Sequence, residues 1–345
     1  TIPILSVKYP LKKEKDNILI NGTFLPNEIL LKEISSLQPN QVLSHGEYIV
    51  ALRLMEEHIE DIDPELLDSV TPIETQSNPV RIGANWDIFT KNGQAIADDF
   101  KMITKGRKSA PINDTNRVLG KEQIFIEAGA KVNFATINAE TGPVYIGKDA
   151  EIMEGSLIRG PFALGEGSVV RMGARIYGGT TIGPYSKVGG EISNSVIFGY
   201  SNKAHDGFMG NSVLGEWCNL GADTNTSNLK NNYEEVRVWD YAEESFVSTG
   251  LQFCGLFMGD HSKSAINTMF NTGTVVGVSA NVFGSGFPRN FIPSFSWGGA
   301  AGFTVFNINK AVDIAKRVYK RRELDFNAVE EDILREIYKL TQSFR

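Results

Sequence analysis

The sequence lacks several features that would assign it to a common class of protein. It has only two cysteines, Cys218 and Cys254, which excludes a disulfide framework and predicts two buried, reduced thiols. No apolar run approaches the roughly 20 residues that span a bilayer, and the first residues lack the h-region of a signal peptide. The net charge is −7, so nothing favours a nucleic-acid partner. We therefore expect a cytoplasmic protein with no nucleic-acid partner and no membrane insertion.

Glycine, by contrast, is abundant after residue 140 and accompanies a six-residue repeat. Aliphatic residues recur at every sixth position from Ile146 to Val188, and glycine follows four of them. This spacing fits neither the 3.6-residue period of a helix nor simple strand alternation. A fixed hexapeptide repeat is typical of a parallel β-helix, in which stacked coils form an apolar column. We predict a β-helix over 123–303, closed by an irregular cap at 283–303.

The repeat is interrupted in the segment Glu191–Asn228. The six-residue spacing slips by two between Val188 and Val196, and Asn202 stands where an aliphatic residue is expected. A break in a regular scaffold is where function is expected. Shortly after it comes His205, and histidine is the side chain whose ordinary pKa, near 6.5, suits a general base at neutral pH.

The chain before the repeat shows weaker patterns. Residues 1–75 are interpreted as a partial α/β region, with a strand at 17–24 and helices at 25–37 and 47–58. Two of the four histidines, His45 and His58, lie here and are expected to be surface or capping residues. Residues 76–122 show little periodicity and are interpreted as an irregular connection.

Two later segments depart from the repeat. Residues 225–252 lose its register and are expected to project from the coils as a loop with a short strand or hairpin. Residues 304–345 carry two apolar stripes with helical spacing, which predicts amphipathic helices with a break near 325–327.

A resemblance to a known family rests on two stretches. Residues 189–230, GGEISNSVIFGYSNKAHDGFMGNSVLGEWCNLGADTNTSNLK, resemble the C-terminal domain of the bifunctional GlmU-type enzymes, and 255–277 resemble its later coils. The whole of 76–345 resembles the divergent Bacteroidetes-type branch. The resemblance implies a mainly β fold with a left-handed parallel β-helix. It also implies acetylation of glucosamine-1-phosphate by acetyl-CoA, for UDP-N-acetylglucosamine synthesis, by a homotrimer whose active site is shared between subunits.

The family's site residues carry over position by position. His205 matches the catalytic histidine, the general base, in the KAH-x-G-F-x-G motif. Glu191 matches a glutamate near the substrate amine, and Asn228 matches an asparagine that contacts the sugar. Arg175 matches the phosphate-binding arginine, whose guanidinium can pair with two phosphate oxygens.

The sequence departs from the family at two positions. Ser193 replaces a second phosphate-binding cation, for which Lys203 or Lys230 is expected to compensate. Phe208 replaces an aromatic residue with a hydroxyl group, so one substrate hydrogen bond is lost. The amino-sugar phosphate is therefore less firmly indicated than the reaction.

Acetyl-CoA in this family lies in grooves between coils of adjacent subunits. By position, the residues expected to bind it are Ala222, Gly259, Asp260, Ser262, Ala280 and Arg289. His261, in the same region, is a second choice for the base.

Other functions remain open. The family's other half is a uridylyltransferase with a glycine-rich phosphate loop, which residues 1–75 lack, and Gly22 and Thr23 stand where related enzymes have a metal-binding acid. Mg²⁺ is expected only if a nucleotidyltransferase domain is active. The alternatives are such an enzyme, with the β-helix as an assembly domain, and a non-catalytic scaffold or sugar-nucleotide sensor. A β-helical carbonic anhydrase needs three metal-binding histidines, and the repeats have only His205 and His261, so no metal site is expected.

Overall fold

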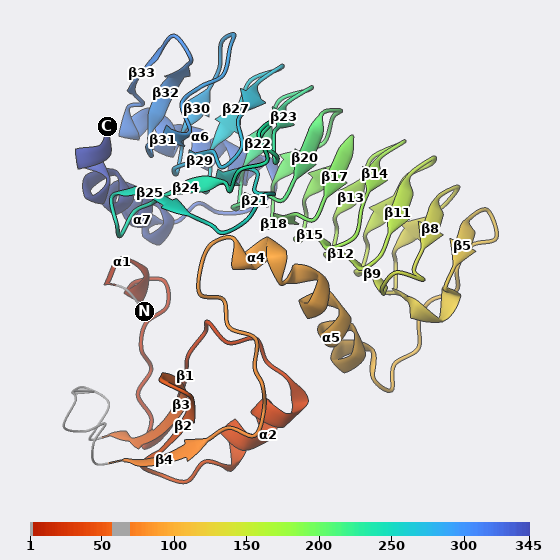
Figure 1. Ribbon diagram of the computed structural model, residues 1–345, viewed down its shortest axis with the longest axis vertical. Coiled ribbons are helices and arrows are strands. Elements are labelled where there is room, and N and C mark those ends of the chain that lie inside the picture. Colours follow the sequence, from red (N-terminus) through yellow and green to blue (C-terminus); the bar gives the residue numbers. More distant parts are fainter. Residues whose placement is uncertain (1–2, 57–69) are drawn as a thin grey trace. The chain divides into compact units, whose positions relative to one another are not determined.

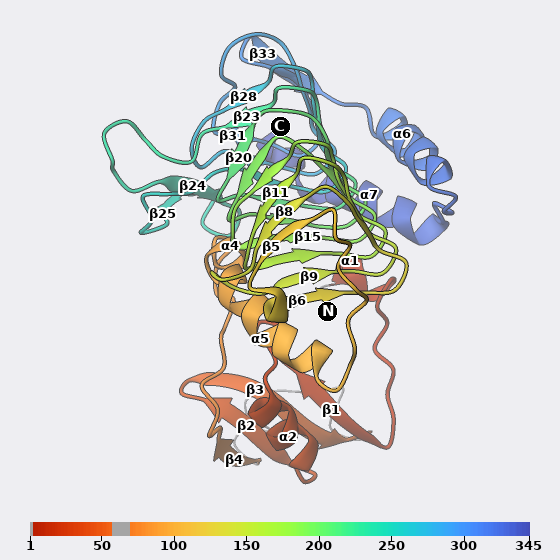
Figure 2. The ribbon, with the colours of Figure 1, turned by 90° about the vertical axis from the view of Figure 1, so that its right-hand side faces the viewer.

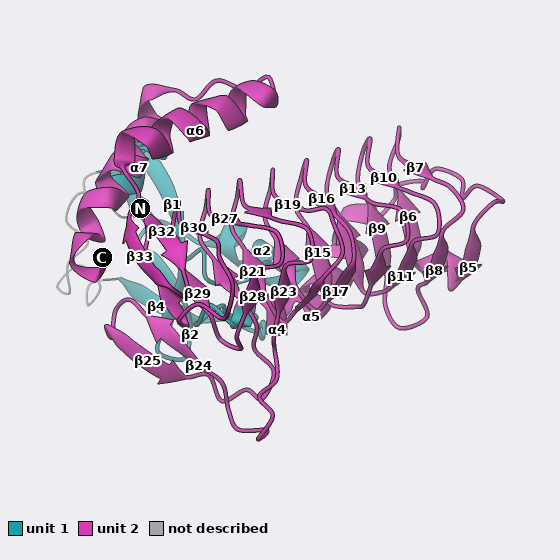
Figure 3. Ribbon diagram, turned by 90° about the horizontal axis from the view of Figure 1, so that it is seen from above, with its two compact units in different colours: residues 1–87 teal, residues 88–345 magenta. Residues whose placement is uncertain are grey.

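The computed structural model describes residues 3–56 and 70–345, which divide into two compact units, 1–87 and 88–345 (Figure 3). The sequence had suggested a boundary near residue 75. His58 and the end of the helix expected over 47–58 lie outside the described residues. Among the described residues, no helix is both long and apolar enough to cross a membrane.

The first unit holds a four-stranded sheet in the order β1-β3-β2-β4, where only β2 and β4 pair in parallel. Its elements are α1 (Pro3–Ser6), β1 (Asp16–Ile20), α2 (Glu28–Ser36), β2 (Gln41–His45), β3 (Tyr48–Met55) and β4 (Thr71–Glu74). Asn27 caps α2 by accepting a hydrogen bond from the Leu30 backbone N–H at 2.9 Å. The expected strand and first helix are confirmed as β1 and α2.

The helix expected over 47–58 is wrong, because Tyr48–Met55 is the strand β3. Val50, Ala51, Leu52 and Leu54 are all buried in this strand, which pairs on both edges. A strand covered on both faces reads as a continuous apolar run, and such a run cannot be told from a buried helix by periodicity.

The second unit is a parallel β-helix whose coils run through three sheets (Figures 1 and 2). The ten-stranded sheet contains β7 (Lys131–Val132), β10 (Glu151–Ile152), β13 (Val169–Val170), β16 (Lys187–Val188), β19 (Asn202–Lys203), β22 (Asn219–Leu220), β27 (Lys263–Ser264), β30 (Asn281–Val282), β32 (Ser296–Gly299) and β33 (Gly302–Val305). The nine-stranded sheet contains β6 (Ile124–Ile126), β9 (Val144–Ile146), β12 (Phe162–Leu164), β15 (Thr180–Ile182), β18 (Val196–Ile197), β21 (Val213–Leu214), β26 (Phe257–Met258), β29 (Val275–Val276) and β31 (Phe291–Ile292).

The third face begins as a six-stranded sheet. Its strands are β5 (Arg117–Leu119), β8 (Thr136–Asn138), β11 (Leu157–Arg159), β14 (Arg175–Ile176), β17 (Glu191–Ser193) and β20 (Phe208–Gly210), and a further pair is β23 (Asn225–Thr226) with β28 (Met269–Phe270). The segment expected to project carries the antiparallel hairpin of β24 (Arg237–Asp240) and β25 (Ser245–Ser248), as predicted.

The apolar column predicted from the repeat is confirmed. Every aliphatic residue at the six-residue positions from Ile146 to Val188 is at most 3% exposed, and together they belong to one continuous core. Cys218 also lies in this core. Cys254, which comes shortly before β26, is buried as well. Burial raises the pKa of each thiol to about 12, so both are inert.

After Val188 the phase of the repeat differs from the one expected. Parallel pairing aligns Ile197 with Ile182 and Lys203 with Val188, so Ile197 and Lys203 face inward. Val196 and Asn202 face outward, although they were assigned to the column. Inward Ile192 and Ile197 follow Val188 after four and then five positions instead of six, so two shortened turns displace the phase by one residue at Val196, Asn202 and Phe208. Leu214 and Leu220 face inward as predicted.

The connection expected at 76–122 and the cap expected at 283–303 are both more regular than predicted. The first holds α4 (Asp87–Thr90), α5 (Asn92–Thr104) and β5, followed by the turn η2 (Lys121–Gln123), so the β-helix begins before residue 123. Asn92 fastens α5 to the nine-stranded sheet, because its side chain donates to the Gly179 carbonyl at 2.7 Å and accepts from the Thr181 hydroxyl at 2.9 Å. The segment 283–303 supplies β31, all of β32 and the first half of β33.

The chain ends in α6 (Ile308–Arg321), α7 (Ala328–Leu340) and the turn η3 (Gln342–Phe344). Asn327 caps α7 by accepting from the Glu330 backbone N–H at 3.1 Å, which confirms the break expected near 325–327. The apolar stripe of α6 packs on Trp217 and Phe295, at the turns that lead from the nine-stranded sheet into the ten-stranded sheet.

Candidate functional site

His205 is exposed at a bend between β19 and β20, where the chain turns from the ten-stranded into the six-stranded sheet. We call residues 204–207, with 189–190 and 221–224 of the adjacent coils, the glycine corner. A Cβ at Gly190 would lie 2.8 Å from the carbonyl oxygens of His205 and Gly207, and one at Gly207 would lie 2.2 Å from the Thr224 carbonyl oxygen. Glycine at 190 and 207 therefore lets the turn that carries His205 stack between its neighbours.

Lys203 does not lie where a phosphate could reach it, which corrects its assignment to substrate binding. Its side chain is 2% exposed and points into the coil. Its Nζ donates to the carbonyl oxygens of His205 at 2.6 Å and Asp206 at 3.2 Å. Burial lowers the pKa of Lys203 to about 8, although the charges of Asp206 and Asp223 oppose this shift.

Arg175, Glu191 and Phe208 form one outward row across β14, β17 and β20. The Nε of Arg175 lies 3.5 Å from a carboxylate oxygen of Glu191, and both side chains are partly exposed. Phe208 follows on the next strand, and its backbone N–H donates to the Asn225 side chain at 2.8 Å. The row thus places a guanidinium, a carboxylate and an aromatic ring on three adjacent strands. The last of these, β20, directly follows the bend that contains His205.

Asn228 lies at the other end of β20. Its Nδ2 donates to the side-chain oxygen of Asn211 at 2.8 Å, and a Cβ at Gly210 would lie 2.6 Å from it. Lys230 is less closely associated, because its Nζ donates to the Glu235 carbonyl at 2.7 Å within the exposed loop that precedes β24. Asn228 is therefore hydrogen-bonded to the residue that follows β20, whereas Lys230 is hydrogen-bonded only within its own loop among the residues that the structure describes.

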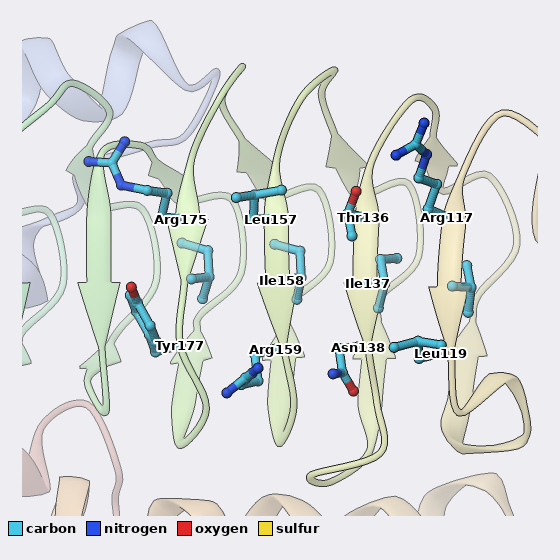
Figure 4. A pocket seen from close by; sticks show the side chains of 12 residues that line it. Arg117, Leu119, Thr136, Ile137, Asn138, Leu157, Ile158, Arg159, Arg175 and Tyr177 are labelled. Carbon is cyan, nitrogen blue, oxygen red and sulfur yellow. The ribbon is translucent and has the colours of Figure 1, made fainter.

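A hollow of 540 Å³ extends from Arg175 along the outer face of the six-stranded sheet. Figure 4 shows Arg117 and Arg175 at opposite ends of one row of its lining, with Arg159 and Tyr177 in the second row. Arg117, Arg159 and Tyr177 were not among the residues expected from the sequence. They flank inward-facing aliphatic residues, and that pattern would have found them once the three faces of the coil were assigned.

The residues expected to bind acetyl-CoA lie at two different corners. Ala222 is at the glycine corner, whereas Gly259, Asp260, Ser262 and Ala280 lie at the turns from the nine-stranded into the ten-stranded sheet.

Two of these residues are structural, which corrects their assignment. Ser262 and Ala280 are fully buried, and the Ser262 hydroxyl donates to the Gly277 carbonyl at 2.5 Å and accepts from the Ala280 N–H at 2.9 Å. Asp260 is exposed and accepts from the Glu216 N–H at 2.9 Å. Arg289 sits 5.3 Å from the Phe303 ring centroid, near the end of the coils.

His261 belongs to a stack of rings that we call the aromatic corner, formed by Tyr185, Tyr200, Trp217, His261 and Tyr319 of α6. Trp217 is at its centre, with ring centroids 4.2 Å from Tyr200 and 4.0 Å from Tyr319. The His261 ring lies 6.3 Å from that of Trp217, and the residue is 9% exposed. It is therefore a packing residue and not a base open to substrate.

No group of three or more side chains suited to hold a metal ion occurs within residues 3–56 and 70–345. In the first unit, the Thr23 hydroxyl donates to the Asn21 side chain at 2.8 Å, where a metal-binding acid would be needed. The described residues therefore do not fit an Mg²⁺ site.

Comparisons with known proteins match both units. A family model described as sugar nucleotidyl transferase matches residues 1–108. A bifunctional sugar-1-phosphate nucleotidylyltransferase/acetyltransferase of Sulfurisphaera tokodaii is 33% identical over 144 residues, or 41% of this chain and 35% of the relative. The bifunctional protein GlmU of Methanocaldococcus jannaschii is 29% identical over 39% of this chain and 28% of that protein.

The match thus spans about a third of the length of these curated relatives. Among solved structures, the Arabidopsis UDP-N-acetylglucosamine acyltransferase is 17% identical, with a TM-score of 0.26, covering 67% of this chain and 93% of that one.

Proposed function

We propose that this chain, a GlmU-like protein with a β-helix domain, transfers the acetyl group of acetyl-CoA to the amine of an amino-sugar 1-phosphate. Glucosamine-1-phosphate is the first candidate substrate. The observation that carries the proposal is the exposed His205 at the glycine corner, beside the strand row of Arg175 and Glu191. The corner and the row together supply a base, a carboxylate and a cation, one group each for the proton, the amine and the phosphate of an amino-sugar phosphate.

The chemistry needs one proton transfer in each direction. His205 accepts a proton from the amine as its nitrogen attacks the thioester carbonyl, and a C–N bond forms. The C–S bond then breaks, and the departing thiolate of coenzyme A takes the proton from His205. Glu191 orients the amine and stabilises the protonated imidazole, while Asn228 binds a sugar hydroxyl without adding charge.

The phosphate of the substrate pairs with Arg175, which exchanges its contact with Glu191 for a dianion. Lys230 can add a second cation only if its loop moves from its Glu235 contact. Ala222 lies at the glycine corner, whereas Gly259 and Asp260 lie at the other corner of the coils, and all three are at least partly exposed. We infer that acetyl-CoA is bound in a homotrimer, where a neighbouring subunit brings a second surface to the glycine corner.

A thiol-release assay with the full chain, acetyl-CoA and glucosamine-1-phosphate tests the proposal. His205→Ala should lower kcat by about 10²–10⁴, the usual loss for a general base. His45→Ala, which changes a half-buried histidine of the first unit, is the control and should keep full activity. The assignment of the base would be falsified if His205→Ala kept more than about a tenth of the activity. Ligand binding without thiol release, unchanged in His205→Ala, would instead favour a scaffold or sensor.

A second candidate is sugar-1-phosphate nucleotidyl transfer by the first unit, favoured by the family model that matches residues 1–108. The test is release of pyrophosphate from UTP and N-acetylglucosamine-1-phosphate in the presence of Mg²⁺. Release that persists in His205→Ala would assign a second activity to the chain. No release would leave the β-helix as its catalytic part, in keeping with the poor fit of the described residues to Mg²⁺.

A further inference from the structure

One ammonium group lies inside the mainly aliphatic column of the ten-stranded sheet. Lys203 aligns with Val188 of the preceding coil and occupies the inward position, where it is 2% exposed. Lysine is almost never fully buried unless its charge is compensated. Its presence among aliphatic residues therefore calls for a physical reason at this point of the chain.

The reason lies in what the ammonium binds. Its hydrogen bonds go to the carbonyl oxygens of His205 and Asp206, the two residues at the tip of the glycine corner. The Asp206 carbonyl also accepts from the Asp223 N–H of the next coil at 3.1 Å. Lys203 thus fastens the tip from inside, while Asp223 fastens it from the following coil.

The packing of the column does not require a charge at this position. Replacing a buried charge by a hydrophobic residue of similar volume is often neutral or stabilising. The charges that face Lys203 are Asp206 and Asp223, which favour the ammonium, and Arg175, which opposes it. Burial outweighs them and lowers the pKa of the amine to about 8. Burial therefore disfavours the charged form of this lysine, and the hydrogen bonds of that form go to the turn that carries His205.

We propose that Lys203 is a positioning residue, whose ammonium holds the carbonyls of His205 and Asp206 and thereby fixes where the His205 imidazole meets the substrate. The inference rests on the proposed role of His205 as base. Lys203 touches no substrate and acts only through the backbone of the glycine corner.

The test compares Lys203→Met with Lys263→Met in the full chain. Methionine keeps the length and volume of the side chain and removes the ammonium. Lys263 is a matched control, because it lies in the same sheet, is half-buried and donates to a single carbonyl, that of His261 at 2.9 Å, but at the turns of the aromatic corner. Two quantities are measured: the steady-state kinetics of thiol release and hydrogen exchange of the backbone amides.

We expect Lys203→Met to lower kcat by about 10- to 100-fold, with little change in KM, because a misplacement of about 1 Å can lower a rate 10²-fold. Amides of residues 205–207 and of Asp223 should exchange at least tenfold faster, with the rest of the coils unchanged. Lys263→Met should keep its kcat and leave those amides protected. Unchanged exchange at the glycine corner in a folded Lys203→Met protein would overturn the inference.

The two proposals fail in different ways. If wild-type protein releases no thiol but Lys203→Met still opens the glycine corner in hydrogen exchange, the acetyl transfer is wrong and the anchoring role of Lys203 stands. If Lys203→Met does not fold, the wild-type protein is titrated by NMR with lysine labelled at Cε. The lysine in contact with the Val188 methyl groups should then titrate near pH 8, and an ordinary value near 10.4 would refute the buried ammonium.

Discussion

The glycine corner and the aromatic corner are two edges of the same coils, built from the same repeat, yet they differ in almost every physical respect. At the aromatic corner the rings of Tyr200, Trp217 and Tyr319 stack and exclude water, and α6 covers them. At the glycine corner the backbone turns tightly, His205 is exposed, and the buried side chain of Lys203 donates a hydrogen bond to the His205 carbonyl. The comparison indicates that one edge packs side chains against one another, whereas the other holds an exposed histidine over a buried charge.

The histidine pair gives the largest test of this comparison. His205→Ala should lower kcat by a factor of about 10²–10⁴, because it removes the proposed general base. It should leave the free energy of unfolding almost unchanged, because the His205 side chain is exposed. His261→Ala should do the reverse and lower the free energy of unfolding by about 0.5–3 kcal/mol, because it removes a ring from a buried stack. Thiol release and urea unfolding measure the two effects. Equal losses of activity in both variants would remove the distinction between the corners.

Trp217 at the centre of the aromatic corner should matter most for stability. The residue is 5% exposed and contacts rings of two elements. Trp217→Ala is expected to lower the free energy of unfolding by about 3–5 kcal/mol, while kcat of the protein that remains folded stays near the wild-type value. The control is Tyr177→Ala, at an aromatic residue 45% exposed on the outer sheet face, with an expected change within about 0.5 kcal/mol.

The buried ammonium predicts a dependence of stability on pH. The pKa of Lys203 is lowered from 10.5 to about 8 in the folded protein. The folded protein therefore loses this proton first, and the free energy of unfolding should rise as the pH increases from about 8 to about 10.5. The gain is on the order of 3 kcal/mol relative to Lys203→Met. The charges of Asp206, Asp223 and Arg175 are common to both proteins and cancel in the difference. Parallel stability curves for the two proteins would contradict the prediction.

The smallest effect is expected at the Arg175–Glu191 pair. An exposed ion pair contributes about 0–1 kcal/mol, so Arg175→Met should hardly change unfolding. If Arg175 binds the phosphate, the same variant should raise KM for the amino-sugar phosphate by about 10- to 100-fold, the range of a charge-assisted hydrogen bond. Arg117→Met, at the far end of the hollow, is the control and should keep the wild-type KM. A similar KM change in both variants would transfer the phosphate site to the hollow as a whole.

Much of the fold was accessible from the sequence because a hexapeptide period has few structural solutions. The period predicted the inward residues from Ile146 to Val188, and the hairpin and C-terminal helices followed from local patterns. The strand β3 was mistaken for a helix because burial on both faces removes the alternation that identifies a strand.

The candidate site was less accessible, since it depends on which coils and corners meet. A motif resemblance found His205, Arg175 and Glu191, and the pairing of β14, β17 and β20 brings the last two together with Phe208. The expected cofactor residues were chosen by their place in the chain, and the corners separate Ala222 from Gly259. Ser262 faces inward at its corner, and no local sequence pattern predicts that orientation.

By itself the sequence determined the period, and with it a coiled parallel sheet, an apolar column and a histidine at a break in that column. Only the tertiary structure decided the phase after the break, which turns Asn202 outward and Lys203 inward. The physical reason is that register in a solenoid is set by hydrogen bonds between coils of unequal length, so the shortened turns between Val188 and Ile197 displace the inward positions by one residue until the predicted phase returns at Leu214. Because of that shift Lys203, which the sequence predicts to be a surface cation, is buried and donates hydrogen bonds to the turn that contains His205.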